Sequence, residues 1–177
     1  MKLSRISLLG FMATGKSTVG QLLAGELELE FLETDALIVD REGQSIEQIF
    51  EKKGEEYFRR CEREVLKEVL SSARGFVLST GGGIVLKKEN RKLLQEYTFP
   101  VLLEADPEVI FERSRQDQNR PLLQVENPRQ RIRELLAERR EFYYRFENRV
   151  DTTGKSPREI VEQIKQMMGD DVVESGS

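Results

Sequence analysis

Short apolar runs alternate with longer stretches of helical periodicity along the whole chain. A run of consecutive apolar residues is typical of a strand buried on both faces, whereas apolar residues three or four apart indicate one face of a helix. Their alternation predicts a parallel sheet covered by helices on both faces, with right-handed crossovers. The strand-like runs are Leu3–Leu9, Glu30–Glu33, Phe76–Ser79, Phe99–Glu104 and, more weakly, Arg149–Asp151.

The segments between these runs carry the helical pattern, and several open with residues that favour the start of a helix. Three begin with proline, which suits the first helical turn, and another begins with Ser45, a good N-cap residue. The chain therefore has the pattern of the α/β class. The expected helices are Thr18–Leu27, Ser45–Glu51, Glu55–Ser72, Lys87–Tyr97, Pro107–Arg113, Pro128–Glu147 and Pro157–Met168.

Two segments fit the core of such a sheet poorly. One is the helical region from about 35 to 72, and the other is the polar segment Ser114–Asn127. A polar loop of that length inside a compact domain is more often a lid than a passive connection. The acidic, small-residue end of the chain, 169–177, is expected to be a frayed tail. Without a repeat or a linker, residues 1–168 are expected to form one domain.

Composition describes a soluble globular protein and excludes several classes of function. The 177 residues are 38% apolar and 34% charged, and the net charge of −4 comes without a basic tail, so neither nucleic acid nor membrane is an expected partner. The absence of histidine excludes histidine-based catalysis and histidine metal sites. One cysteine, Cys61, permits no internal disulfide, and no apolar segment suits a signal sequence or a membrane span. We expect a cytoplasmic protein.

The strongest motif is Gly-Phe-Met-Ala-Thr-Gly-Lys-Ser at residues 10–17, directly after an apolar run. Its G-x4-G-K-S spacing between a strand and a helix is typical of a phosphate-binding loop, in which curled backbone N–H groups and a helix N-terminus surround an anion. Lys16 would reach the β- and γ-phosphates, and the Ser17 hydroxyl would hold Mg2+. The alternative is a glycine-rich turn in some other α/β protein. In this context the motif predicts binding of a nucleoside triphosphate.

Further polar groups follow the predicted strands, at the edge where open α/β sheets bind ligands. The Asp35 carboxylate would orient a hydroxyl for attack or take its proton, with an N-cap of the next helix as the alternative. Glu33 would help hold Mg2+ through a water, or is a solvated acid. The glycines 81–83 indicate close approach of a ligand to the backbone, with a tight bend as the alternative.

Several arginines are candidate anion ligands. Arg59 and Glu62 are three apart on a helix, so Glu62 would pair with Arg59 and orient it toward a carboxylate. From the pattern alone, the charged run 59–64 is more typical of a salt-bridged face in solvent, and the same holds for the arginine pair 139–140. Arg120 lies beside a proline in the polar segment, where a closing lid would bring it to a transferring phosphoryl group.

Taken in order, these motifs resemble those of the shikimate kinases, a family of the nucleoside monophosphate kinase-like P-loop group, from about Leu8 to Ile164. The phosphate loop alone is shared with many unrelated enzymes, but the full set is specific. The resemblance implies a three-layer P-loop fold with a five-stranded parallel sheet, a helical substrate-binding region at about 33–62 and a lid at about 114–127. The motifs are Gly10–Ser17, Glu33 with Asp35, Phe58-Arg59-Arg60 followed by Glu62, Gly81-Gly82-Gly83, Arg120-Pro121-Leu122-Leu123, Glu138-Arg139 with Tyr143, and Val150-Asp151-Thr152.

The resemblance also implies roles for individual residues. Arg59 and Arg139 would hold the shikimate carboxylate, and Asp35 would bind the ring hydroxyls. The implied backbone contacts to shikimate come from Gly81, Gly82 and Gly83. The implied catalytic residues are Lys16, Asp35 and Arg120, and the metal would be held by Ser17 and Glu33. The implied nucleotide site comprises Gly10, Ala13, Thr14, Gly15, Lys16, Ser17, Thr18, Arg120 on the phosphates, and Arg113 and Pro157 at the adenine.

Two positions depart from the family pattern. Glu33 stands where the family usually has aspartate, so a water-mediated contact to Mg2+ would be kept or shifted by one methylene. Ala13 stands where glycine is frequent, which is tolerable if its φ is negative. Neither change removes a group that the transfer needs.

The expected reaction is ATP-dependent phosphorylation of the 3-hydroxyl of shikimate, by a monomer that uses ATP and Mg2+. One alternative is a P-loop kinase for another small polyhydroxy acid such as gluconate. The other is a non-catalytic nucleotide-binding relative, which would be expected to have lost Lys16, Asp35 or Arg120, and all three are present. A nucleoside monophosphate kinase is disfavoured by the substrate-site motifs.

Overall fold

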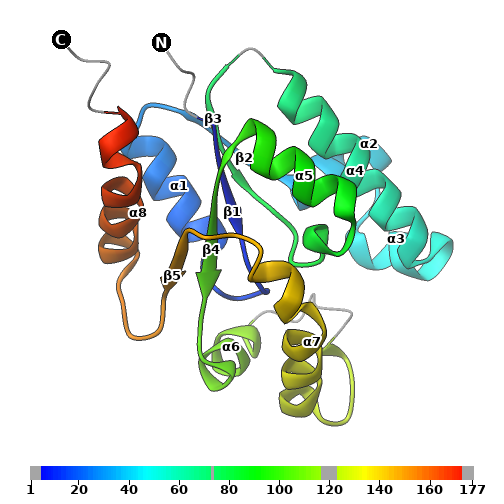
Figure 1. The fold of residues 1–177 in the computed structure, drawn as a ribbon. Coiled ribbons are helices and arrows are strands. Elements are labelled where there is room, and N and C mark those ends of the chain that lie inside the picture. The colour runs from blue at the N-terminus through cyan, green and yellow to red at the C-terminus, as the bar shows by residue number, and fades with distance from the viewer. Residues whose placement is uncertain (1–4, 73, 117–122, 173–177) are drawn as a thin grey trace.

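The computed structural model describes residues 5–72, 74–116 and 123–172. Its centre is a five-stranded sheet in the order β2-β3-β1-β4-β5, in which every neighbouring pair is parallel (Figure 1). The predicted α/β fold is therefore confirmed, and each strand lies within an apolar run that predicted it. The strands are β1 (Arg5–Leu9), β2 (Glu30–Glu33), β3 (Phe76–Ser79), β4 (Phe99–Glu104) and β5 (Arg149–Asp151).

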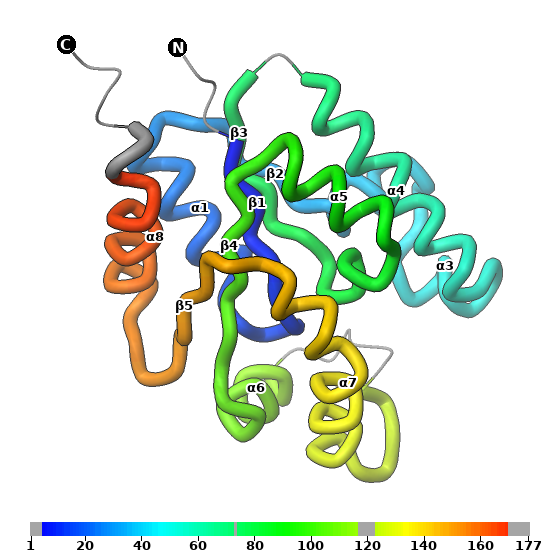
Figure 2. Tube along the Cα trace, in the orientation of Figure 1, coloured from blue at the N-terminus to red at the C-terminus, as the bar shows by residue number. Residues whose placement is uncertain are grey.

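Helices cover both faces of the sheet, because alternate residues of the central strands are buried on opposite sides. Ile6 and Leu8 of β1 pack in one apolar cluster with helices α1 (Lys16–Glu26) and α8 (Pro157–Val172). Leu9 belongs to the other cluster, to which the remaining α-helices contribute. Figure 2 shows the two helical layers on opposite sides of the strands. The apolar runs are continuous because their strands are buried on both faces.

The strand order puts the carboxyl end of β1 at the position where open α/β sheets commonly bind ligands. From β1 the chain moves to β2 and β3 on one side of the sheet, and from β3 it crosses to β4 and β5 on the other. A crevice forms where the order reverses in this way. The loop of residues 10–15, between β1 and α1, lies at that point.

The helical region predicted from about 35 to 72 consists of three helices. They are α2 (Thr34–Glu42), α3 (Ile46–Lys53) and α4 (Glu55–Ser71), and both α2 and α3 pack against α4. Gly43 and Gly54 follow the first two helices with φ values of 66° and 80°, which glycine adopts more readily than any other residue. The prediction that Ser45 caps a helix is confirmed, since its hydroxyl accepts a hydrogen bond from the Gln48 N–H.

The remaining elements follow the predictions with differences at their ends. The chain turns after Tyr143, where the Phe146 N–H bonds the Tyr143 carbonyl, so the predicted helix to Glu147 was too long. Helix α8 continues to Val172, and the expected tail therefore begins within a helix. A 3-10 turn directly after the glycines 81–83 was not predicted. These elements are η1 (Ile84–Leu86), α5 (Lys88–Tyr97), α6 (Pro107–Ser114) and α7 (Pro128–Tyr143).

The predicted lid lies between α6 and α7. Its residues 117–122, which include Arg120, are outside the described part of the chain, so both the lid and the role of Arg120 stay predictions. None of the described helices is long and apolar enough to cross a membrane.

Gly25 and Gly43 offer a matched test of backbone geometry, because a methyl group at either position would meet no atom within 4 Å. We expect Gly25→Ala, within α1, to raise the free energy of unfolding by about 0.5–1 kcal/mol. Gly43→Ala should lower it by about 1 kcal/mol, because an L-residue is strained at positive φ. Urea unfolding measures both changes, and shifts of the same sign would contradict this geometry.

Candidate active site

The phosphate loop requires glycine at its first position. Gly10 has a φ of 139°, and a methyl group there would collide with the carbonyl oxygen of Leu103 in β4. Gly15, at the start of α1, has a φ of 95°. The two glycines let the backbone curl between β1 and α1, as the motif predicts.

Lys16 lies over this loop and is almost fully buried. Its ammonium donates hydrogen bonds to the carbonyls of Gly10 (2.9 Å) and Phe11 (2.8 Å). The Thr14 hydroxyl donates to the same Phe11 carbonyl at 2.8 Å. The loop therefore holds a cation at its centre, where an entering phosphate would meet it.

Ala13 adopts a left-handed conformation with a φ of 59°, so the condition of a negative φ is not met. An L-residue is disfavoured there because its Cβ crowds the following carbonyl, at a cost of roughly 1–2 kcal/mol. The Ala13 carbonyl accepts a hydrogen bond from Arg113 Nη1 at 3.2 Å, and the same nitrogen donates to Thr152 Oγ1 at 3.3 Å. Arg113, predicted at the adenine, thus also ties α6 to the phosphate loop and to the segment after β5.

Ser17 and Glu33 meet beside the loop, where the Ser17 hydroxyl donates a hydrogen bond to the Glu33 carboxylate. Oxygen ligands of this kind suit Mg2+, which commonly keeps several waters and binds one or two protein groups plus substrate phosphates. No group of three or more acidic or cysteine side chains in the described residues could hold a metal alone. The pair fits a metal that arrives with a nucleotide.

A cavity of about 230 Å3 joins the phosphate loop to the glycine loop, which comprises residues 81–83. Backbone contacts explain this proximity. A methyl group on Gly82 would lie 3.4 Å from the Gly10 carbonyl oxygen and 3.4 Å from the Met12 nitrogen. The cavity is lined by Met12, Ala13, Gly15, Lys16, Ser17, Thr18, Glu33, Asp35, Ser79, Thr80, Gly81 and Gly82.

The glycine loop also contacts the side chains predicted to hold the acceptor. A methyl group on Gly83 would collide with the Arg59 guanidinium, and one on Gly82 would lie 3.3 Å from Arg139 Nη1. On Gly81 it would lie 3.0 Å from Asp35 Oδ1. These functional groups thus approach the backbone closely, and at Gly83 the fixed Arg59 guanidinium leaves no room for a side chain. Residues 82 and 83 also form a turn, in which the Ile84 N–H donates to the Gly81 carbonyl, so the alternative of a tight bend is not contradicted.

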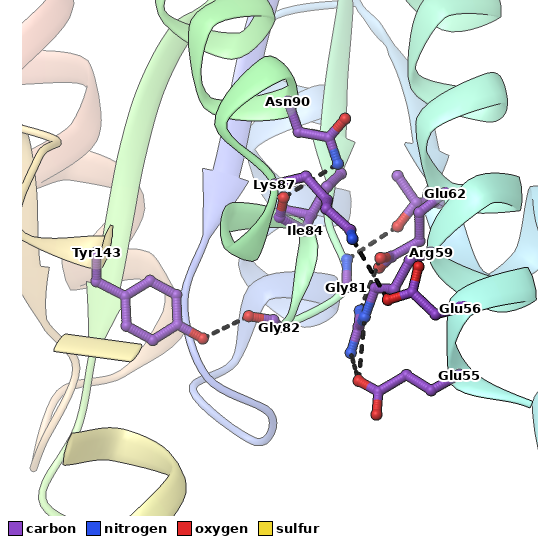
Figure 3. Close-up of polar contacts among 11 residues, drawn as sticks. Glu55, Glu56, Arg59, Glu62, Gly81, Gly82, Ile84, Lys87, Asn90 and Tyr143 are labelled. Atoms are coloured by element: carbon purple, nitrogen blue, oxygen red, sulfur yellow. Dashed lines mark hydrogen bonds and ion pairs between the residues drawn. The ribbon is translucent and has the colours of Figure 1, made fainter. Parts of the chain in front are cut away.

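Arg59 is fixed by two carboxylates of its own helix (Figure 3). Its Nη1 donates to Glu62 at 2.7 Å, and its Nη2 donates to Glu55 at 3.1 Å. The Arg59 and Glu62 side chains are only 5% and 0% exposed, and Arg139 is also buried. The interpretation of run 59–64 as a solvent-exposed face is therefore wrong for these two residues, and the same holds for Arg139.

Glu62 is the most perturbed acid of the site. Burial raises its pKa from 4.5 to about 7, against the opposing attraction of Arg59, and the nearby charge of Asp35 raises it further. One of its oxygens, Oε1, is buried with no hydrogen-bond partner among the described residues. This oxygen would lie 2.8 Å from a methyl group on Gly81, so it faces the glycine loop beside Asp35.

Two residues that hold the glycine loop had no role assigned from the sequence, although Tyr143 belongs to one of the motifs. The Thr34 hydroxyl, fully buried at the start of α2, accepts a hydrogen bond from the Gly81 N–H at 2.9 Å. The Tyr143 hydroxyl donates to the Gly82 carbonyl at 2.6 Å (Figure 3). Thr34 precedes Asp35 at a strand end, which was the available signal. The partner of Tyr143 is 61 residues away, so no local pattern reveals it.

The structure thus brings most predicted site residues to one edge of the sheet. Asp35 lies in the first turn of α2, whose N-cap is Glu33, so the N-cap alternative for Asp35 is wrong. Pro157 is an exposed residue that opens α8, and its contact with adenine stays a prediction.

Comparison with known proteins gives a single family. The family model described as shikimate kinase matches residues 12–169. The shikimate kinase of Thermodesulfovibrio yellowstonii is 44% identical over 162 residues, covering 92% of this chain and 93% of that protein. A structure of shikimate kinase from Acinetobacter baumannii in complex with shikimate superposes with a TM-score of 0.91 at 39% identity, over 96% of this chain and 95% of that one. A gluconokinase from Sinorhizobium meliloti, 17% identical with a TM-score of 0.58 over 99% of each chain, shares the fold alone.

The raised pKa of Glu62 predicts a pH-dependent stability. An acid whose pKa rises on folding favours the folded state when protonated, so its contribution is full below pH 4.5 and is lost as the pH rises through about 7. In the wild type, the free energy of unfolding should therefore fall by up to about 3 kcal/mol between pH 4.5 and about 7. We expect this fall to be absent in Glu62→Gln. Urea unfolding at several pH values compares the two proteins.

Glu55→Gln is the matched control, because Glu55 is the other ion-pair partner of Arg59. The Glu55 side chain is 52% exposed, so it is not desolvated as Glu62 is. This variant should keep the wild-type slope. Parallel stability profiles for wild type and Glu62→Gln would contradict the assignment.

Proposed function

The chain belongs to the shikimate kinase family, and we propose that it transfers the terminal phosphoryl group of ATP to the 3-hydroxyl of shikimate. One observation carries this assignment to the site. Two buried arginines, Arg59 and Arg139, approach the glycine loop, which itself touches the phosphate loop. A cationic pocket so close to the nucleotide site suits a small acceptor with a carboxylate.

The substrate pocket would act by fixing the acceptor before transfer. Arg59 and Arg139 would grip the carboxylate, because a guanidinium matches two carboxylate oxygens at once. Asp35 would orient the attacking hydroxyl and accept its hydrogen bond. The unpartnered Oε1 of Glu62, beside Asp35, would accept a hydrogen bond from a second hydroxyl of a polyhydroxy ring. Backbone N–H and carbonyl groups of the glycine loop complete the pocket.

The phosphate loop would stabilise the charge that develops on the transferring group. Lys16 would exchange its present carbonyl partners for phosphate oxygens, while the curled N–H groups of residues 10–15 hold the nucleotide. Arg113, linked to Ala13 and Thr152, would face the base together with Pro157. Arg120 would reach the phosphates from the lid. Catalysis is then mainly positioning and charge stabilisation.

Ser17 and Glu33 would hold Mg2+, the Glu33 carboxylate through a water. Bound there with the nucleotide, the ion would neutralise charge on the phosphates. The hydrogen bond between the two side chains supports this assignment, because it brings a hydroxyl and a carboxylate together beside the phosphate loop.

The alternative kinase for gluconate has weaker support, because the gluconokinase likeness is one of fold. A non-catalytic relative is also disfavoured, since Lys16 and Asp35 line the same cavity. We propose that the enzyme acts as a monomer. We place the reaction in the cytoplasm, where ATP is available and the single cysteine, Cys61, is a free thiol.

Acceptor specificity tests the function directly. A coupled assay of ADP release should show rapid turnover with shikimate and negligible turnover with gluconate. Lys16→Ala serves as the control for contaminating kinases, and should reduce turnover at least about a hundredfold, because it removes a preorganised charge from the transition state. Binding of ATP without phosphorylation of shikimate would reject the proposal.

Arg59→Ala tests the carboxylate grip. A charged hydrogen bond contributes about 1.5–3 kcal/mol, so the Kd for shikimate measured by calorimetry should rise at least about tenfold. Arg60→Ala is the matched control, because its exposed guanidinium lies over the Tyr57 ring and not in the pocket.

Removal of Arg59 leaves Glu62 buried without its cation. The double variant Arg59→Ala, Glu62→Gln therefore separates a loss of fold from a loss of binding. A folded double variant with unchanged shikimate affinity would show that Arg59 does not hold the carboxylate.

A further inference from the structure

A second cavity, of about 340 Å3, lies behind the phosphate loop between the end of β4, helix α6 and helix α7. Its walls are mainly apolar and aromatic, from Phe11, Leu102, Ile110, Leu136 and Tyr143. The volume is at the low end of the range of about 300–1,000 Å3 for ligand pockets, so it suits a small molecule.

This cavity is distinct from the site described above. The residues that hold phosphate and shikimate in the proposed function, Lys16, Ser17, Asp35, Arg59 and Arg139, are absent from its lining. Among the residues of the phosphate loop, only Phe11 and Thr14 line this cavity. The opposite wall comes from α6 and α7.

Two charged side chains line the cavity, Glu104 and Arg140. Glu104 ends β4 two residues after Leu102, so both side chains lie on the same face of the strand. In the part of the chain that the structure describes, neither the Glu104 carboxylate nor the Arg140 guanidinium has an ion-pair partner. They are therefore too far apart to pair with each other, although they line one cavity.

The Arg140 end of the cavity is strongly cationic. Tyr144, which also lines the cavity, is 47% exposed. The Arg140 guanidinium lies 5.1 Å from the centre of this ring, and that of Arg149 lies 4.7 Å from it. Arg149 likewise has no ion-pair partner within the described residues. Because Arg140 lines the cavity and has no ion-pair partner, its guanidinium is a favourable place for a carboxylate.

We propose that this cavity binds an α-amino acid with a large apolar side chain. Its carboxylate would bind Arg140, its ammonium would bind Glu104, and its side chain would fill the space against Phe11 and Tyr143. A neutral apolar ligand would desolvate both charges without pairing them, and a simple carboxylate would leave Glu104 unpaired. A zwitterion with an apolar body satisfies both charges and the walls together.

Calorimetry with L-phenylalanine as the probe tests the proposal, without turnover and so independently of the kinase assay. We expect a Kd below about 1 mM. Two analogues dissect the contacts: 3-phenylpropionate lacks the ammonium, and 2-phenylethylamine lacks the carboxylate. Each should bind at least about tenfold more weakly, because each leaves one charged group unpaired.

Variants assign the site. Arg140→Gln should weaken phenylalanine binding at least about tenfold. In Glu104→Gln, phenylalanine and 3-phenylpropionate should bind with similar Kd values, because the partner of the ammonium has been removed. Arg74→Gln, which makes the same charge change in the exposed loop before β3, should bind like the wild type. The melting temperature of each variant checks its fold.

Three outcomes would overturn the proposal. These are no binding of phenylalanine at millimolar concentration, affinities unchanged in both Arg140→Gln and Glu104→Gln, and displacement of phenylalanine by saturating shikimate. Binding that persists with shikimate present and falls in both variants supports it.

Discussion

The buried ion pair of Arg59 and Glu62 is the interaction on which the glycine-loop half of the candidate site depends. Both groups lose their hydration, and a buried charge is tolerated only when its partner is well placed. The Arg59 guanidinium and the Glu62 carboxylate both lie directly against the backbone of residues 81–83, where glycines leave room for them. The glycine loop is then held in turn by Thr34 and Tyr143. Helix α4, the glycine loop, Thr34 and Tyr143 thus bring four separate parts of the chain into contact.

The sheet connects this unit to the nucleotide half. Strand β1 leads into the phosphate loop, and its neighbour β3 leads into the glycine loop, so parallel pairing brings the two loops together at the carboxyl edge. Gly82 is close to Gly10 because of this register. The order of the strands therefore determines which side chains lie next to the phosphate loop.

The sequence predicted the fold well because its signals are local. Continuous apolar runs marked the strands, and Gly10–Ser17 marked the phosphate loop without any distant contact. The pattern alone was misleading for Arg59 and Arg139, because burial of a charged helix face depends on what packs against it. Only the resemblance to a family assigned those arginines to the substrate. The hydrogen bond from Tyr143 and the left-handed Ala13 depend on tertiary contacts, so no periodicity reveals them.

The left-handed Ala13 has a consequence for the free energy of nucleotide capture. Alanine restricts the unfolded loop more than glycine does, so less conformational entropy is lost when the loop becomes ordered. The strained turn is held by the Arg113 hydrogen bond before any phosphate arrives. A loop that is ordered in advance leaves more of the interaction energy with the triphosphate as affinity, at the expense of the stability of the empty protein.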